Sequence, residues 1–247
     1  MTHTFPKRPT RTRHPGAVAP TPALALCVAL VGVSWLFYAF PGIDIRVSGW
    51  FHDPVNGFAL QDDAALTFLR WSGIRITQAL LLILVLRLGW LGWQVLRGGA
   101  AAAWARAHGA LWLLACLASG PGLLVNGLLK SHWGRPRPRD TDLFGGAAPF
   151  EPVWVIGDGC ARNCSFVSGE AASAAWLVAA ALLAPRPIRP AVVAGTSVYA
   201  LALSLNRVAF GGHYLSDVVL AWLLCGLVFL ALHRLIVAGP REPRPSE

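Results

Sequence analysis

Six long apolar runs constrain the fold of this chain more than any other feature. A helix that crosses a bilayer needs about 20 mostly apolar residues, and the chain is 55% hydrophobic but only 13% charged. The sequence therefore predicts an all-α, polytopic membrane protein with six transmembrane helices. Arg87 interrupts the second run, and the fourth is short. The expected spans are Pro22–Phe40, Gly73–Gly92, Ala110–Leu129, Phe166–Ala184, Pro190–Val208 and Tyr214–Val237.

The two ends of the chain differ in composition from the apolar part. Residues 1–21 and 239–247 are rich in proline and arginine, a composition typical of segments that cannot bury a core. We expect a disordered basic tail over 1–21, a membrane domain over 22–238 and a second tail over 239–247. The first apolar run has no small-residue cleavage site after it, which favours an uncleaved span.

The positive charges are distributed unequally between the two sides of this six-span arrangement. One side carries 12 Lys and Arg residues against only Glu242 and Glu247, a net charge of +10, and the other carries 9 cations and 10 acids, a net of −1. Cytoplasmic loops of membrane proteins are enriched in Lys and Arg. Both termini are therefore expected in the cytoplasm. The basic excess indicates topology and affinity for anionic lipid, not a nucleic-acid partner.

The five cysteines fall into two groups. Cys27, Cys116 and Cys225 lie inside expected spans and are expected to pack there. Cys160 and Cys164 lie in an exterior loop, where an oxidising compartment favours a local disulfide over two free thiols. A zinc site is less favoured, because the sequence has no second ligand pair at suitable spacing.

Three polar segments fall on the exterior side in this topology. The segment nearest the C-terminus runs from Arg207 to Asp217 and is the third of the three. A helix that starts after Tyr214 would put His213 and Asp217 on one face. A carboxylate can then hold one imidazole nitrogen and leave the other free for chemistry on an anion. An ordinary juxtamembrane loop with a capping Asp is the alternative interpretation.

The other two segments supply more anion-binding groups. The first opens with Lys130 and continues through an Arg-Pro-Arg-Pro run, in which prolines would aim the guanidinium groups rigidly. The second places Ser168, Gly169 and Glu170 at the start of the fourth span, where backbone N–H groups at a helix N-terminus attract anions. The alternative interpretations are that the cations only snorkel to the membrane surface and that the Ser-Gly-Glu sequence only caps a helix. Together the three segments predict a phosphate cradle on one membrane face.

These residues resemble the signatures of the type 2 phosphatidic acid phosphatases, the PAP2 family. Lys130 and, after six residues, Arg137-Pro138 resemble the first signature, Ser168-Gly169 the second, and Arg207, His213 and Asp217 the third. The string from Gly134 to Gly146, followed by Asn163-Cys-Ser-Phe, is similar to bacterial members that act on lipid A and related lipid phosphates.

The resemblance implies an integral membrane lipid phosphatase with a periplasmic active site in the bacterial inner membrane. His213 would attack phosphorus and form a phosphohistidine, and Asp217 would orient it. Lys130, Arg137, Ser168, Gly169 and Arg207 would bind the phosphate. No metal and no cofactor are implied, because Lys and Arg supply the positive charge. Arg135 and Arg139 are expected to meet lipid headgroups if they do not join the site.

Three residues depart from the family pattern. Val167 occupies the position where the family has a proline, and Asn206 the position where it has a serine. Glu170 occupies the position of the family's second histidine, the residue that would protonate the leaving oxygen and activate water. An isolated Glu is about two pKa units more acidic than His. Glu170 is therefore expected to be ionised at neutral pH unless the site raises its pKa. Either it serves as the acid/base, aided by a good leaving group such as an anomeric or pyrophosphate oxygen, or its presence leaves a protein that only binds lipid phosphates. A phosphotransferase with the same site and a transporter are further alternatives. The sequence identifies neither the lipid nor the oligomeric state.

Overall fold

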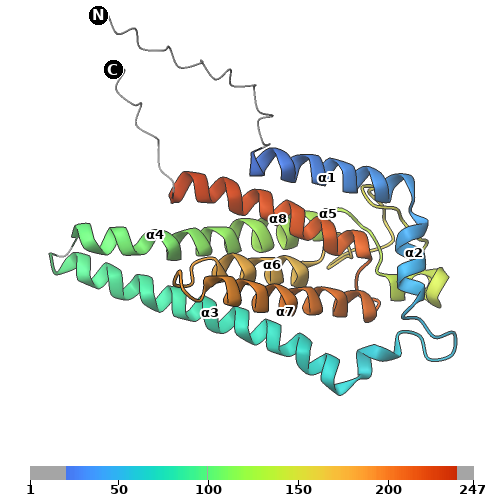
Figure 1. The fold of residues 1–247 in the computed structure, drawn as a ribbon. Helices are drawn as coiled ribbons and strands as arrows, with labels where there is room; N and C mark the ends of the chain where they lie inside the picture. Colours follow the sequence, from blue (N-terminus) through green and yellow to red (C-terminus); the bar gives the residue numbers. More distant parts are fainter. Residues whose placement is uncertain (1–20, 99, 238–247) are drawn as a thin grey trace, which may run out of the picture.

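The computed structural model describes residues 21–98 and 100–237, and every regular element in these ranges is helical. The long helices are α1 (Pro22–Ala39), α3 (Ala64–Leu96), α4 (Ala100–Leu117), α7 (Arg189–Ala209) and α8 (Leu215–Ile236). They lie side by side as an elongated bundle (Figure 1). The predicted tails lie outside the described residues, apart from Thr21, whose side chain caps α1. The all-α prediction is confirmed.

Five helices in the described ranges are long and apolar enough to cross a membrane. They are α1, α3, the helical run Ala107–His132, α7 and α8. The expected fourth span, Phe166–Ala184, is the exception, because its helix α6 (Gly169–Ala181) has 13 residues. Such a helix is about 20 Å long, whereas the hydrocarbon core of a bilayer is about 30 Å thick. The count of six spans therefore remains a prediction.

Helix α6 lies at the centre of the bundle and packs against α4, α7 and α8. Nine of its residues are buried, and six of these are alanines, whose small side chains let the neighbouring helices approach closely. Trp176 is fully buried and its Nε1 donates to the Leu113 carbonyl of α4 at 2.7 Å. Because α6 is enclosed by its neighbours, its sequence has no amphipathic pattern that would indicate which face points to the core.

The third expected span is helical but locally widened. Between α4 and the short α5 (Lys130–His132), residues Ala118–Leu129 form a π-helix around Pro121. Proline lacks the N–H that an α-helix requires. One turn later the side-chain amide of Asn126 donates back to the Pro121 carbonyl at 2.6 Å. The helix is distorted at Pro121 but not interrupted, so it places Lys130 at the end of the bundle.

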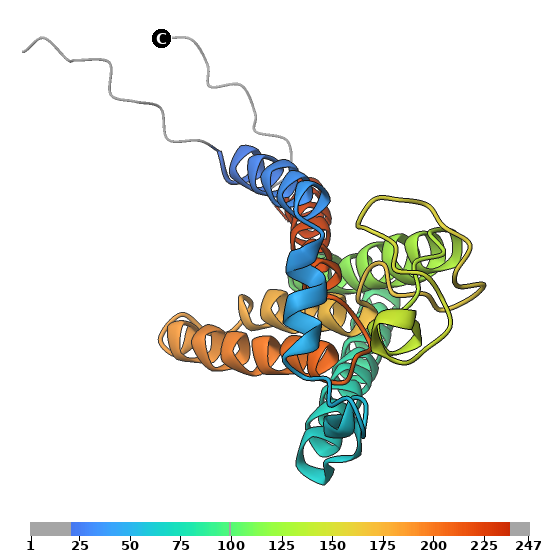
Figure 2. The same ribbon diagram turned by 90° about the vertical axis from the view of Figure 1, so that its right-hand side faces the viewer.

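The same end of the bundle is closed by a short crossing helix and a long loop. Helix α2 (Gly42–Gly49) runs across the ends of the long helices, beside the loop that joins α5 to α6 (Figure 2). Three short 3₁₀ turns, Ala59–Asp62, Pro138–Asp140 and Asp142–Phe144, also lie in the connections of this end.

Candidate active site

Backbone hydrogen bonds join the three polar segments predicted to converge. The Arg139 N–H donates to the Gly211 carbonyl at 3.1 Å, which links the first segment to the third. The Ser168 N–H donates to the Asp217 carbonyl at 3.2 Å, which links the second segment to the third. The N-termini of α6 and α8 and the C-terminus of α7 therefore meet at one end of the bundle.

His213 lies between α7 and α8 and is 2% exposed. Its Nδ1 lies 2.7 Å from the Ser165 carbonyl oxygen and 3.8 Å from Asp217 Oδ2. A carbonyl only accepts, so Nδ1 must carry the proton, and the lone pair of a neutral ring is then on Nε2. Burial lowers the pKa of His213 to about 4, and the charges of Lys130 and Arg207 also lower it, while Asp217 opposes the shift. A neutral, oriented imidazole is the form required of a nucleophile.

Asp217 is fully buried and is held by three further groups. Arg135 NH1 donates to its Oδ1 at 2.6 Å, and the Tyr214 N–H and the Ser165 hydroxyl both donate to its Oδ2. The carboxylate therefore cannot turn away from His213. The hydrogen bond to the imidazole Nδ1 is made by the Ser165 carbonyl, whereas Asp217 lies 3.8 Å away, so the orienting role of Asp217 remains a prediction.

Arg135 was expected to meet lipid headgroups if it did not join the site, and the headgroup alternative is wrong. Its side chain is 0% exposed, and its guanidinium bridges Asp217 and Asp44, with NH2 2.9 Å from Asp44 Oδ2. It also donates to the Glu151 carbonyl and packs over the Tyr214 ring. Asp44, on α2, accepts from the Ser216 N–H at 2.9 Å. Sequence reasoning missed Asp44, because a single acid in an interfacial segment carries no motif.

Arg207 is 3% exposed, yet two of its guanidinium nitrogens, Nε and NH1, make no hydrogen bond within the described residues. Nε lies 3.3 Å from Glu170 Oε1 as an ion pair. A Cβ at Gly212 would lie 2.6 Å from Arg207 NH2, so a larger residue there would displace the guanidinium. Buried donors without partners are costly, and an anion bound beside Arg207 would satisfy them.

The remaining predicted phosphate ligands lie around the same end. Lys130 Nζ donates to the Asn163 side chain at 2.9 Å, and Arg137 NH2 donates to the Asn163 carbonyl at 2.8 Å. Ser168 caps α6 by accepting from the Ala171 N–H. A Cβ at Gly169 would lie 2.7 Å from the Asn126 side chain, so this helix start tolerates only glycine without a shift.

A cavity of about 200 Å³ opens among the cations of this end. It is lined by four arginines and four other residues: Arg70, Arg137, Arg139, Arg207, Gln61, Asp62, Thr67 and Phe210. Arginine forks suit bidentate recognition of phosphate oxygens. Lys130 and Ser168 are not among the lining residues, so a phosphate there contacts arginine first.

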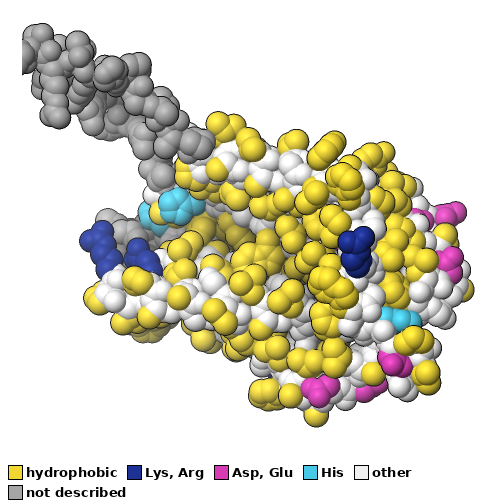
Figure 3. All heavy atoms as spheres, turned by 45° about the vertical axis from the view of Figure 1, so that its right-hand side comes forward, with side chains coloured by type: hydrophobic (Ala, Val, Ile, Leu, Met, Phe, Trp, Pro, Cys, Tyr) yellow, Lys and Arg dark blue, Asp and Glu magenta, His cyan; other side chains and the backbone are white. Residues whose placement is uncertain are grey.

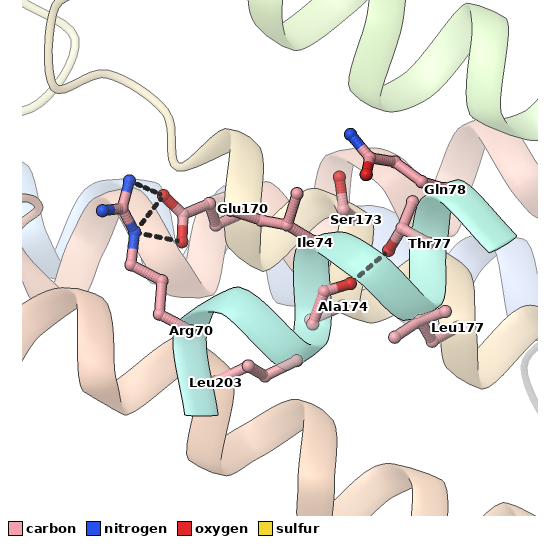
Figure 4. A pocket seen from close by; sticks show the side chains of 10 residues that line it. Arg70, Ile74, Thr77, Gln78, Glu170, Ser173, Ala174, Leu177 and Leu203 are labelled. Carbon is pink, nitrogen blue, oxygen red and sulfur yellow. Dashed lines mark hydrogen bonds and ion pairs between the residues drawn. The ribbon is translucent and has the colours of Figure 1, made fainter. Parts of the chain in front are cut away.

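Arg70 is the functional residue that sequence reasoning missed most completely. It lies in the first turns of α3, and its Nε is 3.1 Å from both carboxylate oxygens of Glu170, with NH2 2.9 Å from Oε1. Figure 4 shows the two side chains pointing toward each other beside a small cavity of about 140 Å³ between α3, α6 and α7. Two guanidinium groups, from Arg70 and Arg207, therefore stabilise Glu170 as an anion. No sequence spacing relates position 70 to position 170.

The exterior loop also contains the predicted cysteine pair. Cys160 and Cys164 form a disulfide with a Cα–Cα distance of 5.6 Å, which is within the usual range. The other three cysteines are free. No group of three or more His, Cys, Asp or Glu side chains arranged to hold a metal occurs within residues 21–98 and 100–237.

A helical membrane bundle with an oriented histidine and an arginine-lined cavity at one end defines a class of membrane proteins that act on anions at the bilayer surface. The chain belongs to the PAP2 superfamily, whose family model matches residues 109–240. It is a membrane-bound phosphatase of the PAP2 type.

Three relatives are similar over most of the chain. Two proteins named lipid A 4'-phosphatase, from Rhizobium leguminosarum and Rhizobium etli, are 42% and 38% identical over 213 residues. Each alignment covers 80% of this chain, and 88% and 80% of the relative. A lipid A 4'-phosphatase from Francisella tularensis subsp. novicida is 36% identical over 78% of this chain and 85% of its own length.

A solved structure shares the fold. It is a PAP2 type phosphatidylglycerolphosphate phosphatase from Bacillus subtilis, with a TM-score of 0.57 and coverage of 90% of this chain and 98% of that one. At 18% sequence identity the likeness supports the helical architecture alone.

Proposed function

We propose that this enzyme removes the 4'-phosphate of lipid A. The observation that carries the proposal is the arginine-lined cavity, whose wall includes Arg137 and Arg207, in a chain 36–42% identical to three proteins named lipid A 4'-phosphatase. A cavity with four arginines suits the anionic oxygens of a phosphate monoester. The same site could bind other lipid phosphates, so the position of the phosphate on the sugar is the decisive variable.

The mechanism proposed is two-step phosphoryl transfer through His213. Nε2 attacks phosphorus in line with the departing lipid oxygen, so an N–P bond forms while the P–O bond to the lipid breaks. Arg137 and Arg207, with Lys130 and the Ser168–Gly169 helix start, hold the non-bridging oxygens, which is the main contribution to catalysis of this reaction. Water then attacks phosphorus, the N–P bond breaks and inorganic phosphate leaves. No step uses a metal.

Glu170 is proposed as the proton carrier of this cycle. A bound phosphate monoester brings a proton when it enters as the monoanion, because its second pKa lies near 6. Glu170 passes that proton to the departing lipid oxygen, later takes one from the attacking water, and releases it to solvent when inorganic phosphate leaves. Its pairing with Arg70 and Arg207 keeps it ionised beforehand, so it enters the second step already able to accept a proton.

Changing Glu170 to Gln should lower kcat by roughly 10²–10⁴, the usual contribution of a general acid–base group. The matched control is Arg70→Gln, which breaks the same ion pair but keeps the carboxylate. Phosphate release at saturating substrate separates them, and we expect Arg70→Gln to raise KM more than it lowers kcat. An equal loss of kcat in both variants would mean that Glu170 only positions arginines.

The chain is a multi-pass membrane protein, and we propose that it spans the bacterial inner membrane with both termini in the cytoplasm. The site would then face the periplasm. The support is the charge distribution, with +10 on the side of the termini and −1 on the side of the site.

The substrate proposal is tested with purified full-length protein and three lipids. These are lipid A with phosphates at both ends, lipid A with only the 4'-phosphate, and lipid A with only the 1-phosphate. We expect inorganic phosphate from the first two and none from the third. Cleavage of the 1-phosphate at a similar rate, or of phosphatidylglycerophosphate in preference to lipid A, would contradict the proposal. A phosphorylated acceptor lipid in place of free phosphate would indicate a phosphotransferase.

A further inference from the structure

The short central helix leaves a space at the end of the bundle opposite the active site. Helix α6 ends at Ala181, while α8 continues to Ile236 and the C-terminal part of α8 faces the first turn of α7 across the gap. The space is a groove of about 520 Å³. Asp217 and His233 lie 16 residues apart on α8, which corresponds to about 24 Å along the helix. The inner end of the groove reaches Trp222, five residues from Asp217, but the groove and the phosphate cavity share no lining residue.

The wall of the groove is apolar. It is formed by Val178 of α6, Leu182 and Leu183 just after it, Trp112 of α4, and Trp222 and Phe229 of α8, with smaller residues between them. The Trp112 indole donates to the Phe229 carbonyl at 3.0 Å, so this wall is fixed. Figure 3 shows a hollow lined mainly by hydrophobic side chains between helices of the bundle, with His and Lys or Arg side chains near its outer end. A wall of this kind suits an acyl chain.

The charged residues that line the groove are all basic. Arg189, at the first turn of α7, has its Nε fixed by the Ala184 carbonyl at 3.0 Å. His233 stacks edge-on against Trp112, with ring centroids 5.4 Å apart. No acidic side chain is among the lining residues. Arg186 and Arg234 are exposed one turn or less from these two residues in sequence. An amphiphile that fits has an apolar tail and an anionic head.

We propose that this groove binds one anionic phospholipid from the leaflet opposite the one that presents the substrate. Its acyl chain lies along the apolar wall and fills the depth that α6 does not span. Its phosphate lies between Arg189 and His233. The lipid thus completes the packing of α4, α6, α7 and α8 at this end, and the proposal does not depend on which lipid the enzyme hydrolyses.

The test counts phospholipids retained by the full-length protein. The protein is reconstituted with equal amounts of phosphatidylglycerol and phosphatidylcholine and then extracted in mild detergent. Native mass spectrometry measures the mass of the protein with any bound lipid. We expect one retained phosphatidylglycerol and little phosphatidylcholine. Equal retention of the two lipids would overturn the selection by charge, and with it the proposal.

Two pairs of variants locate the bound lipid. Leu182→Trp fills the groove, and Leu201→Trp is its control, because Leu182 and Leu201 are 48% and 52% exposed and only Leu182 lines the groove. Arg189→Gln removes the headgroup contact, and Arg97→Gln removes an exposed arginine outside the groove. We expect Leu182→Trp to abolish retention and Arg189→Gln to lower it by about fivefold, the effect of one cation near a headgroup. Both controls should retain lipid as the unchanged protein does.

Unchanged retention in Leu182→Trp would overturn the proposal. So would a change in the number of chains per particle without loss of lipid, because a second copy of the chain would then be the occupant. Phosphate release by each variant verifies that it is folded, so that loss of lipid is not read from a misfolded protein.

Discussion

Replacing His213 with Ala should reduce phosphate release by about 10⁴–10⁶-fold, because the reaction loses its nucleophile. The buried imidazole is neutral above a pKa of about 4, and its Nδ1 proton is engaged by Ser165, so Nε2 is the atom that attacks. The residues that line the arginine-rich cavity include no histidine that could take its place. The measurement is kcat with the preferred lipid, in purified protein.

The matched control for this variant is His132→Ala. His132 is an exposed histidine two residues after Lys130, and its ring contacts only the Leu128 carbonyl among the described residues. We expect this variant to keep its activity and its thermal stability. Activity in His213→Ala within tenfold of the unchanged enzyme would rule out the proposed nucleophile.

Replacing Arg135 with Met should destabilise the protein by about 3–5 kcal/mol, because it leaves two carboxylates in the interior without their cation. Asp44 and Asp217 are 1% and 0% exposed. Burial already raises the pKa of Asp44, and Arg135 opposes that rise. For a domain of this size, such a loss corresponds to a fall in Tm of about 10 °C. Thermal unfolding in detergent measures it.

A second substitution distinguishes charge from packing in this variant. Asp44→Asn in the Arg135→Met background removes one of the two unpaired charges, so we expect part of the lost Tm to return. Arg139→Met is the control for stability, because Arg139 is 39% exposed and forms only a long pair with Asp140 at 3.8 Å. A fall in Tm as large in Arg139→Met as in Arg135→Met would contradict the proposed buried network.

The sequence predicted the convergence of the three polar segments because charge asymmetry and span length together determine which loops share a side. It did not predict the length of α6, since a run of apolar residues contains no signal for where a buried helix ends. The alanine-rich stretch of α6 is apolar on every side, so Phe166–Ala184 was indistinguishable from a span that faces lipid. Three of the six residues by which α6 is shorter than this span, 182–184, lie at the end where the groove opens.

The sequence could not predict which residues form ion pairs with the site residues, for a different physical reason. Arg70 and Asp44 are brought to the site by tertiary packing of α3 and α2, and neither lies at a fixed spacing from Glu170 or Asp217. Arg135 belongs to the Arg-Pro-Arg-Pro run that the sequence shows. Arg135 is more deeply buried than Arg137, and this difference depends on which side of the loop faces Asp217. Only the folded chain determines that.

The most direct test of the account is to trap the phosphorylated enzyme. Glu170→Gln protein is mixed with an aryl phosphate, whose leaving group departs without a proton, quenched at alkaline pH in denaturant within a single turnover, digested and analysed by mass spectrometry. If Glu170 activates the water of the second step, this variant accumulates the intermediate, and the account predicts a phosphoryl group on His213. Continued phosphate release with His213 unmodified, or a phosphoryl group on another residue, would contradict it.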